Sequence, residues 1–359
     1  MTKIAVFRTD ASSLIGSGHV MRCLALADSL RVNGFESIFV CRRLQGHLCE
    51  YIRNKGYDVE WIDSNDDEFR PESDAIMTKE ILARVASPIA WLIIDHYGID
   101  RNWEIQMGSL ANRILVIDDL ANRPHLCDIL VDQNAYERME SRYKDLLPPQ
   151  CLQLLGPGYL LLRPSFYEAR KSLRARDGSL RRLLVFFGGS DPTNETAKAL
   201  RALARRADDE PSFHTDVVIG SANPYRGEVT AMCAERPYAK LHVQAENMAE
   251  LIASADFALG AGGVAMWERC YLGLPSAVTV VADNQAASVR CAAQTGAVAY
   301  LGESAETNAD TYARAIEKAL ESPSELLEMS KRALEITESR ADRTESPVAS
   351  AMLEMDRRG

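Results

Sequence analysis

The sequence predicts an α/β protein built from two doubly wound domains, each a parallel sheet with helices on both faces. Three observations lead to this prediction. At 359 residues the chain is longer than one ordinary hydrophobic core supports. Short apolar runs alternate with helical patterns along the chain, which is typical of parallel sheets that are covered on both sides. Finally, a strand, a glycine loop and a helix open the chain and recur near residue 182.

The first domain is expected over residues 1–160. It opens with a buried strand at 3–8, followed by a glycine-containing loop and an amphipathic helix that begins at His19. Further strands of this half are expected at 37–41, 59–62, 91–94, 114–117 and 129–131.

A hinge is expected at 161–182, where proline and glycine interrupt any periodic pattern. The second domain is expected over 183–335 and opens with a strand at 182–187, a tight glycine loop and a helix from Asn194. Its other strands are expected at 217–219, 240–243, 257–259, 276–280 and 297–301. A helical pattern broken only at Pro347 follows, and residues 336–359 are expected to pack on the first domain.

Composition narrows the possible partners. The net charge of −10 argues against nucleic acid, because binding phosphates requires basic clusters, and the basic run at 170–182 fits a solvated linker. No apolar run is long enough to span a bilayer. The eight cysteines form no C-x-x-C pair and no leader is apparent, so we expect a cytoplasmic protein. We also expect a monomer with no cofactor and no metal, since the His and Cys residues lack metal-ligand spacing.

The loop before the first helix has the residue types of a catalytic site. Gly16 and Gly18 allow backbone N–H groups to approach a ligand, and the helix N-terminus adds positive partial charge. His19 would be a general base beside a phosphate-bearing substrate, with a capping or packing role as the alternative. We expect Asp10 to orient or charge this imidazole.

The same loop only partly matches a dinucleotide-binding fingerprint. Met21 stands where the third glycine would allow close packing of helix and strand. Arg42 or Arg43 would still suit a 2′-phosphate, so an NADP enzyme stays an alternative. A P-loop ATPase is excluded, because the chain has no G-x-x-x-x-G-K-[ST] sequence.

The second domain offers a better nucleotide site. Gly188-Gly189-Ser190 supplies backbone donors and a hydroxyl at a helix N-terminus, which suits a pyrophosphate. A second glycine turn at Gly262 and Gly263 leads into another helix. Glu268, about one and a half turns into it, would bind ribose hydroxyls or be a plain surface acid.

Amide side chains follow the expected strand at 276–280. Asn284 and Gln285 suit sugar or phosphate oxygens, and a simple helix cap by Asp283 or Asn284 is the alternative.

Several longer motifs occur in one order along nearly the whole chain. They are Arg8-Thr-Asp10-Ala-Ser-Ser, Gly16-x-Gly18-His19-x-x-Arg22-Cys, Ile94-Asp95-His96-Tyr97-Gly98, Ile117-Asp118-Asp119, Leu162-Arg163-Pro, Gly188-Gly189-Ser190-Asp191 and Gly260-x-Gly-Gly with Trp267-Glu268 and Asn284-Gln285. Together they resemble the UDP-2,4-diacetamido-2,4,6-trideoxy-β-L-altropyranose hydrolases of pseudaminic acid biosynthesis, which are relatives of the GT-B glycosyltransferases. The chain continues beyond about residue 305, where some relatives stop, so the role of its last helices stays open.

The resemblance implies two Rossmann-like domains facing a central cleft, and a role in flagellin glycosylation. It implies an inverting hydrolysis in which water attacks the anomeric carbon and UDP leaves. The chain has no D-x-D triplet, so helix N-termini and backbone N–H groups would stabilise the leaving diphosphate without a metal. Catalytic roles then fall to His19, Tyr97 and Asp10, and substrate or UDP contacts to Gly16, Gly18, Arg22, Arg163, Gly189, Ser190, Gly262, Gly263, Glu268, Asn284 and Gln285.

Three other functions stay open. A GT-B glycosyltransferase would pass the sugar to an alcohol or lipid, and a UDP-sugar 2-epimerase would abstract a proton at C2. A non-catalytic nucleotide-sugar-binding protein is the alternative of another class, although binding alone needs no poised base. Arg163 would contact the ligand or form a linker salt bridge. The sequence does not rank the sugar stereoisomers.

Overall fold

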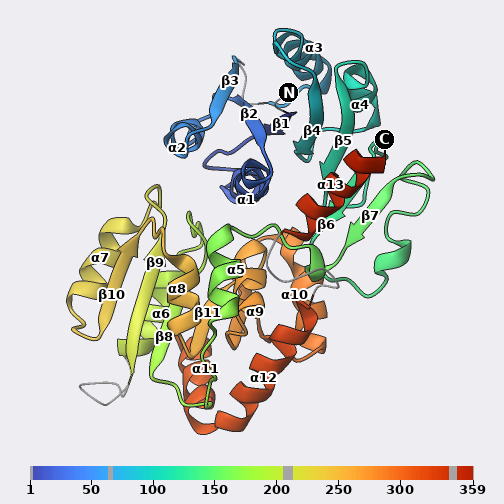
Figure 1. Cartoon of the computed structure of the whole chain (residues 1–359). Coiled ribbons are helices and arrows are strands. Elements are labelled where there is room, and N and C mark those ends of the chain that lie inside the picture. The colour runs from blue at the N-terminus through green and yellow to red at the C-terminus, as the bar shows by residue number, and fades with distance from the viewer. Residues whose placement is uncertain (1–2, 64–67, 205–212, 339–345, 359) are drawn as a thin grey trace. The chain divides into compact units, whose positions relative to one another are not determined.

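The computed structural model describes residues 3–63, 68–204, 213–338 and 346–358 (Figure 1). The chain divides into two compact units. Unit 1 contains the residues up to Pro164 together with the C-terminal helix α13 (Pro347–Arg358), and unit 2 contains the residues from Ser165 to Glu338.

Unit 1 is built on a seven-stranded sheet with the strand order β3-β2-β1-β4-β5-β6-β7. Every neighbouring pair is parallel. The chain runs outward from β1 through β2 to β3 and then returns to the other side of β1 to form β4, so the order reverses between β1 and β4. The strands are β1 (Lys3–Thr9), β2 (Phe35–Arg42), β3 (Asp58–Ile62), β4 (Ile89–Asp95), β5 (Ala111–Ile117), β6 (Ile129–Asp132) and β7 (Leu152–Leu155).

Alternate residues of the central strand β1 enter two different cores. Ala5 and Phe7 pack on the side that carries α1, α2 and α13, while Ile4 and Val6 pack on the side that carries α3 and α4. This alternation follows from the two-residue period of a strand, and burial of both faces explains the continuous apolar runs. The helices are α1 (Gly18–Val32), α2 (Cys49–Asn54), α3 (Pro71–Leu82) and α4 (Arg101–Met107).

Helix α13 belongs to unit 1 although it follows unit 2 in the sequence. Pro347 is its first residue, where the fixed φ angle and the missing N–H of proline are tolerated. Val348 and Met352 are buried in the unit-1 core. Trp91 Nε1 donates a hydrogen bond of 2.9 Å to Asp356, so polar contacts also tie α13 to the sheet.

Unit 2 repeats the same plan with a six-stranded sheet in the order β10-β9-β8-β11-β12-β13, all parallel. Its order reverses between β8 and β11. The strands are β8 (Arg182–Phe186), β9 (His214–Ile219), β10 (Ala239–Val243), β11 (Phe257–Ala261), β12 (Ser276–Val280) and β13 (Ala299–Glu303). The helices are α5 (Pro164–Lys171), which starts at the end of unit 1, α6 (Glu195–Ala204), α7 (Arg226–Ala234), α8 (Met248–Ser254), α9 (Val264–Tyr271), α10 (Ala286–Gln294), α11 (Ala309–Glu321) and α12 (Pro323–Ile336).

The predicted class of doubly wound α/β domains is confirmed, with two local corrections. Residues 152–155 form the edge strand β7, which was not predicted because these four residues between turn-forming segments are too few to show a strand pattern. Pro347 starts a helix rather than interrupting one, and α12 has already ended at Ile336. None of the described helices is long and apolar enough to cross a membrane.

Candidate functional site

The polar residues of unit 1 gather at the carboxyl ends of its two central strands. Asp10 follows β1, Asp95 ends β4, and Tyr97 comes two residues later. His19 lies in the first turn of α1, which follows β1 through the glycine loop. Ligands of open α/β sheets bind where the strand order reverses, and this is that point in unit 1.

His19 and Arg22 both bind the carboxylate of Asp95. His19 Nδ1 lies 2.5 Å from Asp95 Oδ1. Arg22 lies one turn further along α1 and donates from Nε and Nη2 to the two oxygens of Asp95, at 2.6 and 2.7 Å. All three side chains are buried, so this group is rigidly held.

The protonation states follow from these contacts. Burial alone would raise the pKa of Asp95, but the charge of Arg22 and the contact with His19 hold it well below its usual value. An ionised carboxylate only accepts hydrogen bonds, so Nδ1 of His19 carries the proton that points to Asp95. In the neutral imidazole the other ring nitrogen, Nε2, is an acceptor, and it makes no hydrogen bond to a described residue. Such an imidazole is set up to take a proton.

Tyr97 stands edge-on to His19, with ring centroids 4.6 Å apart and an interplanar angle of 83°. Burial, followed by the nearby carboxylate of Asp119, raises the pKa of its phenol. Tyr97 is therefore a neutral hydrogen-bond donor beside the imidazole.

The expected orientation of His19 by Asp10 is wrong. Asp10 accepts hydrogen bonds from Arg8 at 2.7 and 3.1 Å and from Arg42 Nε at 2.8 Å. It also lies 3.3 Å from His96 Nε2. Because Asp10 and Asp95 end neighbouring strands but bind different partners, the sequence could not tell which carboxylate would reach His19.

Arg22 is predicted to contact the ligand, but its guanidinium binds other side chains of the protein. Besides Asp95 it donates from Nη1 to Asp119 at 3.2 Å, so its guanidinium faces carboxylates of the protein. Gly16 has a positive φ of +80°, and Gly18 is the first residue of α1, whose N-cap residue forms no side-chain cap. The first N–H groups of α1 therefore remain available to a ligand, as the sequence suggested. Arg163 is half-buried at the end of unit 1, and its role stays a prediction.

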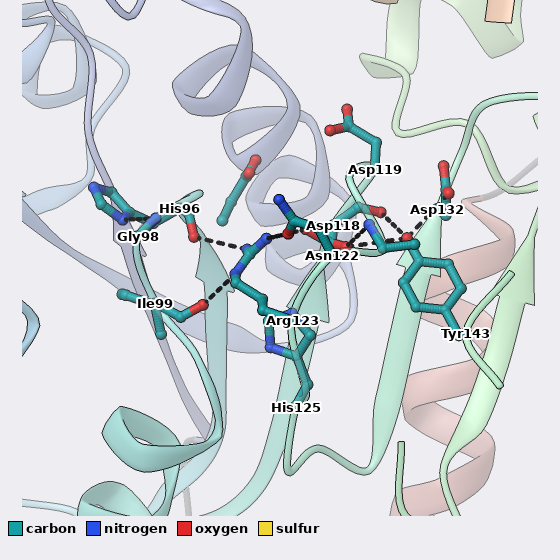
Figure 2. A network of polar contacts seen from close by, with 12 residues as sticks. His96, Gly98, Ile99, Asp118, Asp119, Asn122, Arg123, His125, Asp132 and Tyr143 are labelled. Atoms are coloured by element: carbon teal, nitrogen blue, oxygen red, sulfur yellow. Dashed lines mark hydrogen bonds and ion pairs between the residues drawn. The ribbon is translucent and has the colours of Figure 1, made fainter. Parts of the chain in front are cut away.

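A second polar network lies at the carboxyl ends of β5 and β6 (Figure 2). Arg123 pairs with Asp118 at 2.8 Å and donates to the backbone oxygen of Ile99 at 2.7 Å. The Tyr143 hydroxyl joins Asp118 to Asp132. Figure 2 shows the carboxylate of Asp119 turned away from this network. The network therefore fixes the loop that carries Asp119, which in turn contacts Arg22.

Asp132 should make the stability of the protein depend on pH. Burial raises its pKa to about 6, so the native state keeps a proton that the unfolded chain releases near pH 4. Stability therefore falls as pH rises through this window. Asp132→Asn has no such proton to lose. Between pH 5 and 7.5 we expect the free energy of unfolding of this variant to gain about 1 kcal/mol relative to wild type. Urea unfolding of both proteins at pH 5 and pH 7.5 measures these free energies. If the difference between variant and wild type is the same at both pH values, the pKa of Asp132 is not raised.

The candidate nucleotide site of unit 2 requires one correction. The turn after β8 has Gly188 at a φ of +96° and leads to α6, as expected. However, the N–H groups of Glu195 and Thr196, at the start of α6, are both bound at 2.9 Å by the carboxylate of Asp191. This helix N-terminus is already occupied by an acid, so it is a poor pyrophosphate site. Gly189 and the half-buried Ser190 remain candidates for single contacts.

The turn after β11 is not blocked in this way. Gly263, at a φ of +71°, is the N-cap of α9 and forms no side-chain cap. Gln285 lies over this turn, because a Cβ atom at Gly262 would come within 3.1 Å of Gln285 Oε1 and one at Gly263 within 3.5 Å of Nε2. Gln285 Oε1 accepts from the Val281 N–H at 3.2 Å, so its amide N–H₂ group is directed elsewhere. Donors of two segments thus meet at the carboxyl end of β11.

The remaining residues predicted in unit 2 lie close to these elements in the sequence. Glu268 is half-buried on α9 and Asn284 is exposed in the short helix Asp283–Gln285. Their roles stay predictions. Across the described part of the chain, no three side chains of His, Cys, Asp or Glu gather to hold a metal ion.

Relatives of known sequence agree with the resemblance seen in the motifs. No model of a known protein family matches the chain. The chain is 29% identical over 249 residues to the UDP-2,4-diacetamido-2,4,6-trideoxy-beta-L-altropyranose hydrolase of Campylobacter jejuni, covering 69% of this chain and 80% of that one. The expected resemblance is confirmed.

Two further relatives align over part of their length. The spore coat polysaccharide biosynthesis protein SpsG of Bacillus subtilis is 35% identical over 147 residues, which are 41% of this chain and 43% of that one. Protein MJ1062 of Methanocaldococcus jannaschii is 28% identical over 289 residues, which are 79% of this chain and 56% of that one. The chain thus spans about half the length of these two relatives.

Solved structures with the same fold cover nearly the whole chain. MurG of Acinetobacter baumannii has a TM-score of 0.65 at 12% identity, covering 99% of this chain and 100% of that one. The UDP-GlcNAc 2-epimerase of Neisseria meningitidis has a TM-score of 0.62 at 13% identity, with the same coverage. At these identities the likeness shows the fold alone, and it confirms the predicted GT-B type of two doubly wound domains.

Proposed function

We propose that the chain is an inverting nucleotide-sugar hydrolase that removes UDP from UDP-2,4-diacetamido-2,4,6-trideoxy-β-L-altropyranose, in the cytoplasmic synthesis of pseudaminic acid. The observation that carries this proposal is the pair of His19 and Asp95 at the strand-order reversal of unit 1, with Nε2 left as an acceptor. The named relative from Campylobacter jejuni supports the choice of substrate.

In the proposed reaction His19 Nε2 takes a proton from a water molecule. The water oxygen forms a bond to C1 of the sugar while the bond from C1 to the diphosphate oxygen breaks. The electron pair leaves with UDP, and attack opposite to the leaving group inverts the configuration. Asp95 stabilises the imidazolium that forms, and Tyr97 donates a hydrogen bond to the water or the sugar.

Unit 2 is proposed to hold UDP. N–H groups of Gly263 and of the start of α9 would receive the diphosphate, because no side chain caps them, whereas the Gly262 N–H donates to the backbone oxygen of Thr279 at 3.3 Å. Gln285 would add its amide N–H₂ group. Glu268 remains the candidate for the ribose hydroxyls, and Asn284 for the sugar or phosphates.

The test follows the reaction by proton NMR in ¹⁸O-labelled water with EDTA present. We expect UDP without ¹⁸O and an inverted free sugar that carries ¹⁸O at C1. Turnover only with an added alcohol or lipid acceptor would favour a glycosyltransferase instead. Solvent deuterium at C2 in a D₂O experiment would favour an epimerase, the activity named for the neisserial structure of the same fold. Binding of UDP without any turnover would favour a nucleotide-sugar-binding protein.

A further inference from the structure

Arg269 is a fully buried arginine that meets only neutral groups. Its side chain is 1% exposed. Nε donates to Ser276 Oγ at 3.2 Å and Nη2 to the backbone oxygen of Ala261 at 2.7 Å. Nη1 is buried and has no hydrogen-bond partner among the described residues. Burial lowers the pKa to about 10, which still leaves the guanidinium charged at neutral pH.

The buried arginines of unit 1 are arranged differently. Arg8 pairs with Asp10 and Asp74, and Arg22 pairs with Asp95 and Asp119. In the described part of the chain no carboxylate lies within ion-pair distance of Arg269, and burial outweighs the charge of Glu268, its neighbour in sequence, so that the pKa is lowered. A buried charge without a counter-charge is strongly unfavourable, so an ion that arrives later would relieve this cost.

The guanidinium lies against Gly260, two residues before the glycine turn of unit 2. A Cβ atom at Gly260 would come within 2.6 Å of Nη1, so the absence of a side chain there makes room for the group. The next residue, Ala261, holds Nη2, and the turn at Gly262 and Gly263 follows at once. The uncapped N-terminus of α9 therefore has a second, independent source of positive charge beneath it.

We propose that Arg269 is the buried counter-charge of a nucleoside diphosphate bound at this turn, a positioning residue that acts through the electric field without touching the ligand. This inference rests on the proposal that unit 2 holds UDP. It goes further because it assigns part of the affinity to a charge inside the domain, where salt screens little. It also predicts that the charge of Arg269 strengthens ligand binding and does not stabilise the folded domain.

The test compares UDP with uridine, which has the same base and ribose but no phosphate. For a pair of charges about 10 Å apart at an effective dielectric of about 20, loss of Arg269 should weaken UDP binding by on the order of tenfold or more. We expect Arg269→Met to raise the Kd of UDP by this factor while that of uridine changes less than about twofold. The melting temperature of the ligand-free variant should not fall, because an apolar side chain of similar length removes an unpaired buried charge.

Two further variants make the result decisive. Arg269→Lys keeps the charge and should keep the wild-type ratio of UDP to uridine affinity. Arg176→Met is the matched control, since this guanidinium likewise binds only neutral groups, the backbone oxygens of Ile252, Ala255 and Leu272, before the first residues of β11 and β12. The ratio of UDP to uridine affinity of Arg176→Met should equal that of the wild type.

Three results would overturn the inference. They are an equal loss of UDP and uridine affinity in Arg269→Met, an unchanged UDP affinity, or a variant that no longer folds, which would mean that the charge serves the structure. A wild-type chain that binds uridine and UDP but hydrolyses no UDP-sugar contradicts the proposed function and leaves this inference standing. A wild-type chain that binds no UDP contradicts both.

Discussion

His19→Asn is expected to lower kcat by about 10²–10⁴-fold, the usual contribution of a positioned general base. Asparagine keeps a polar side chain in the first turn of α1 but cannot take a proton from water near neutral pH. The affinity for UDP should stay within about twofold of wild type, because we propose that UDP binds to unit 2. Stopped assays of UDP release and calorimetric UDP binding measure the two quantities.

His125→Asn is the matched control for this variant. His125 also binds a buried carboxylate through Nδ1, that of Glu104 at 2.6 Å, but it lies away from the strand-order reversal. Its replacement should lower stability and leave kcat of the folded enzyme near the wild-type value. Near-normal turnover by His19→Asn, or an equal loss in both variants, would show that the proton goes elsewhere.

Asp95→Asn is expected to damage both stability and turnover. The neutral amide leaves the buried guanidinium of Arg22 with only the more distant Asp119, and breaking a buried ion pair in this way costs about 3–5 kcal/mol. The amide can also donate to His19 Nδ1, which favours the tautomer with its proton on Nε2. That nitrogen then cannot accept a proton, so kcat should fall by about 10²-fold or more.

Asp10→Asn separates the two effects. Asp10 is equally buried and paired with Arg8 and Arg42, but it does not touch His19. We expect a comparable loss in urea unfolding, with the kcat of the folded enzyme and its pH–rate profile close to wild type. A pH–rate profile that moves in Asp10→Asn but not in Asp95→Asn would reverse the assignment of the positioning residue.

The fold followed from local patterns that the sequence displays directly. The continuous apolar run that begins at Ile4 and the recurrence of strand and glycine loop near residue 182 depend on burial of both sheet faces, which leaves few other arrangements. The short edge strand β7 lacked such a signal. Residues 152–155 form a strand because they pair with β6, and the four residues alone do not specify that structure.

The partners within the site could not be predicted in the same way. Asp10, Asp95 and Asp119 each stand at or just after the end of an apolar strand, and that position predicts that they lie at the carboxyl end of the sheet. Which of them reaches His19 depends on side-chain directions and on strand order, and both are set by the tertiary fold. Likewise, Asp191 reads as part of a glycine loop until its carboxylate is seen to bind the start of α6.

The place of α13 constrains how the protein is made. Val348 and Met352 complete the core beside α1, yet the ribosome delivers them only after all of unit 2. Domains generally fold as units during synthesis, with the N-terminal one first. Here the core of unit 1 cannot be completed until unit 2, residues 165–338, and then α13 have been translated. Unit 2 has every residue of its own core before α13 is made, so it is free to fold first.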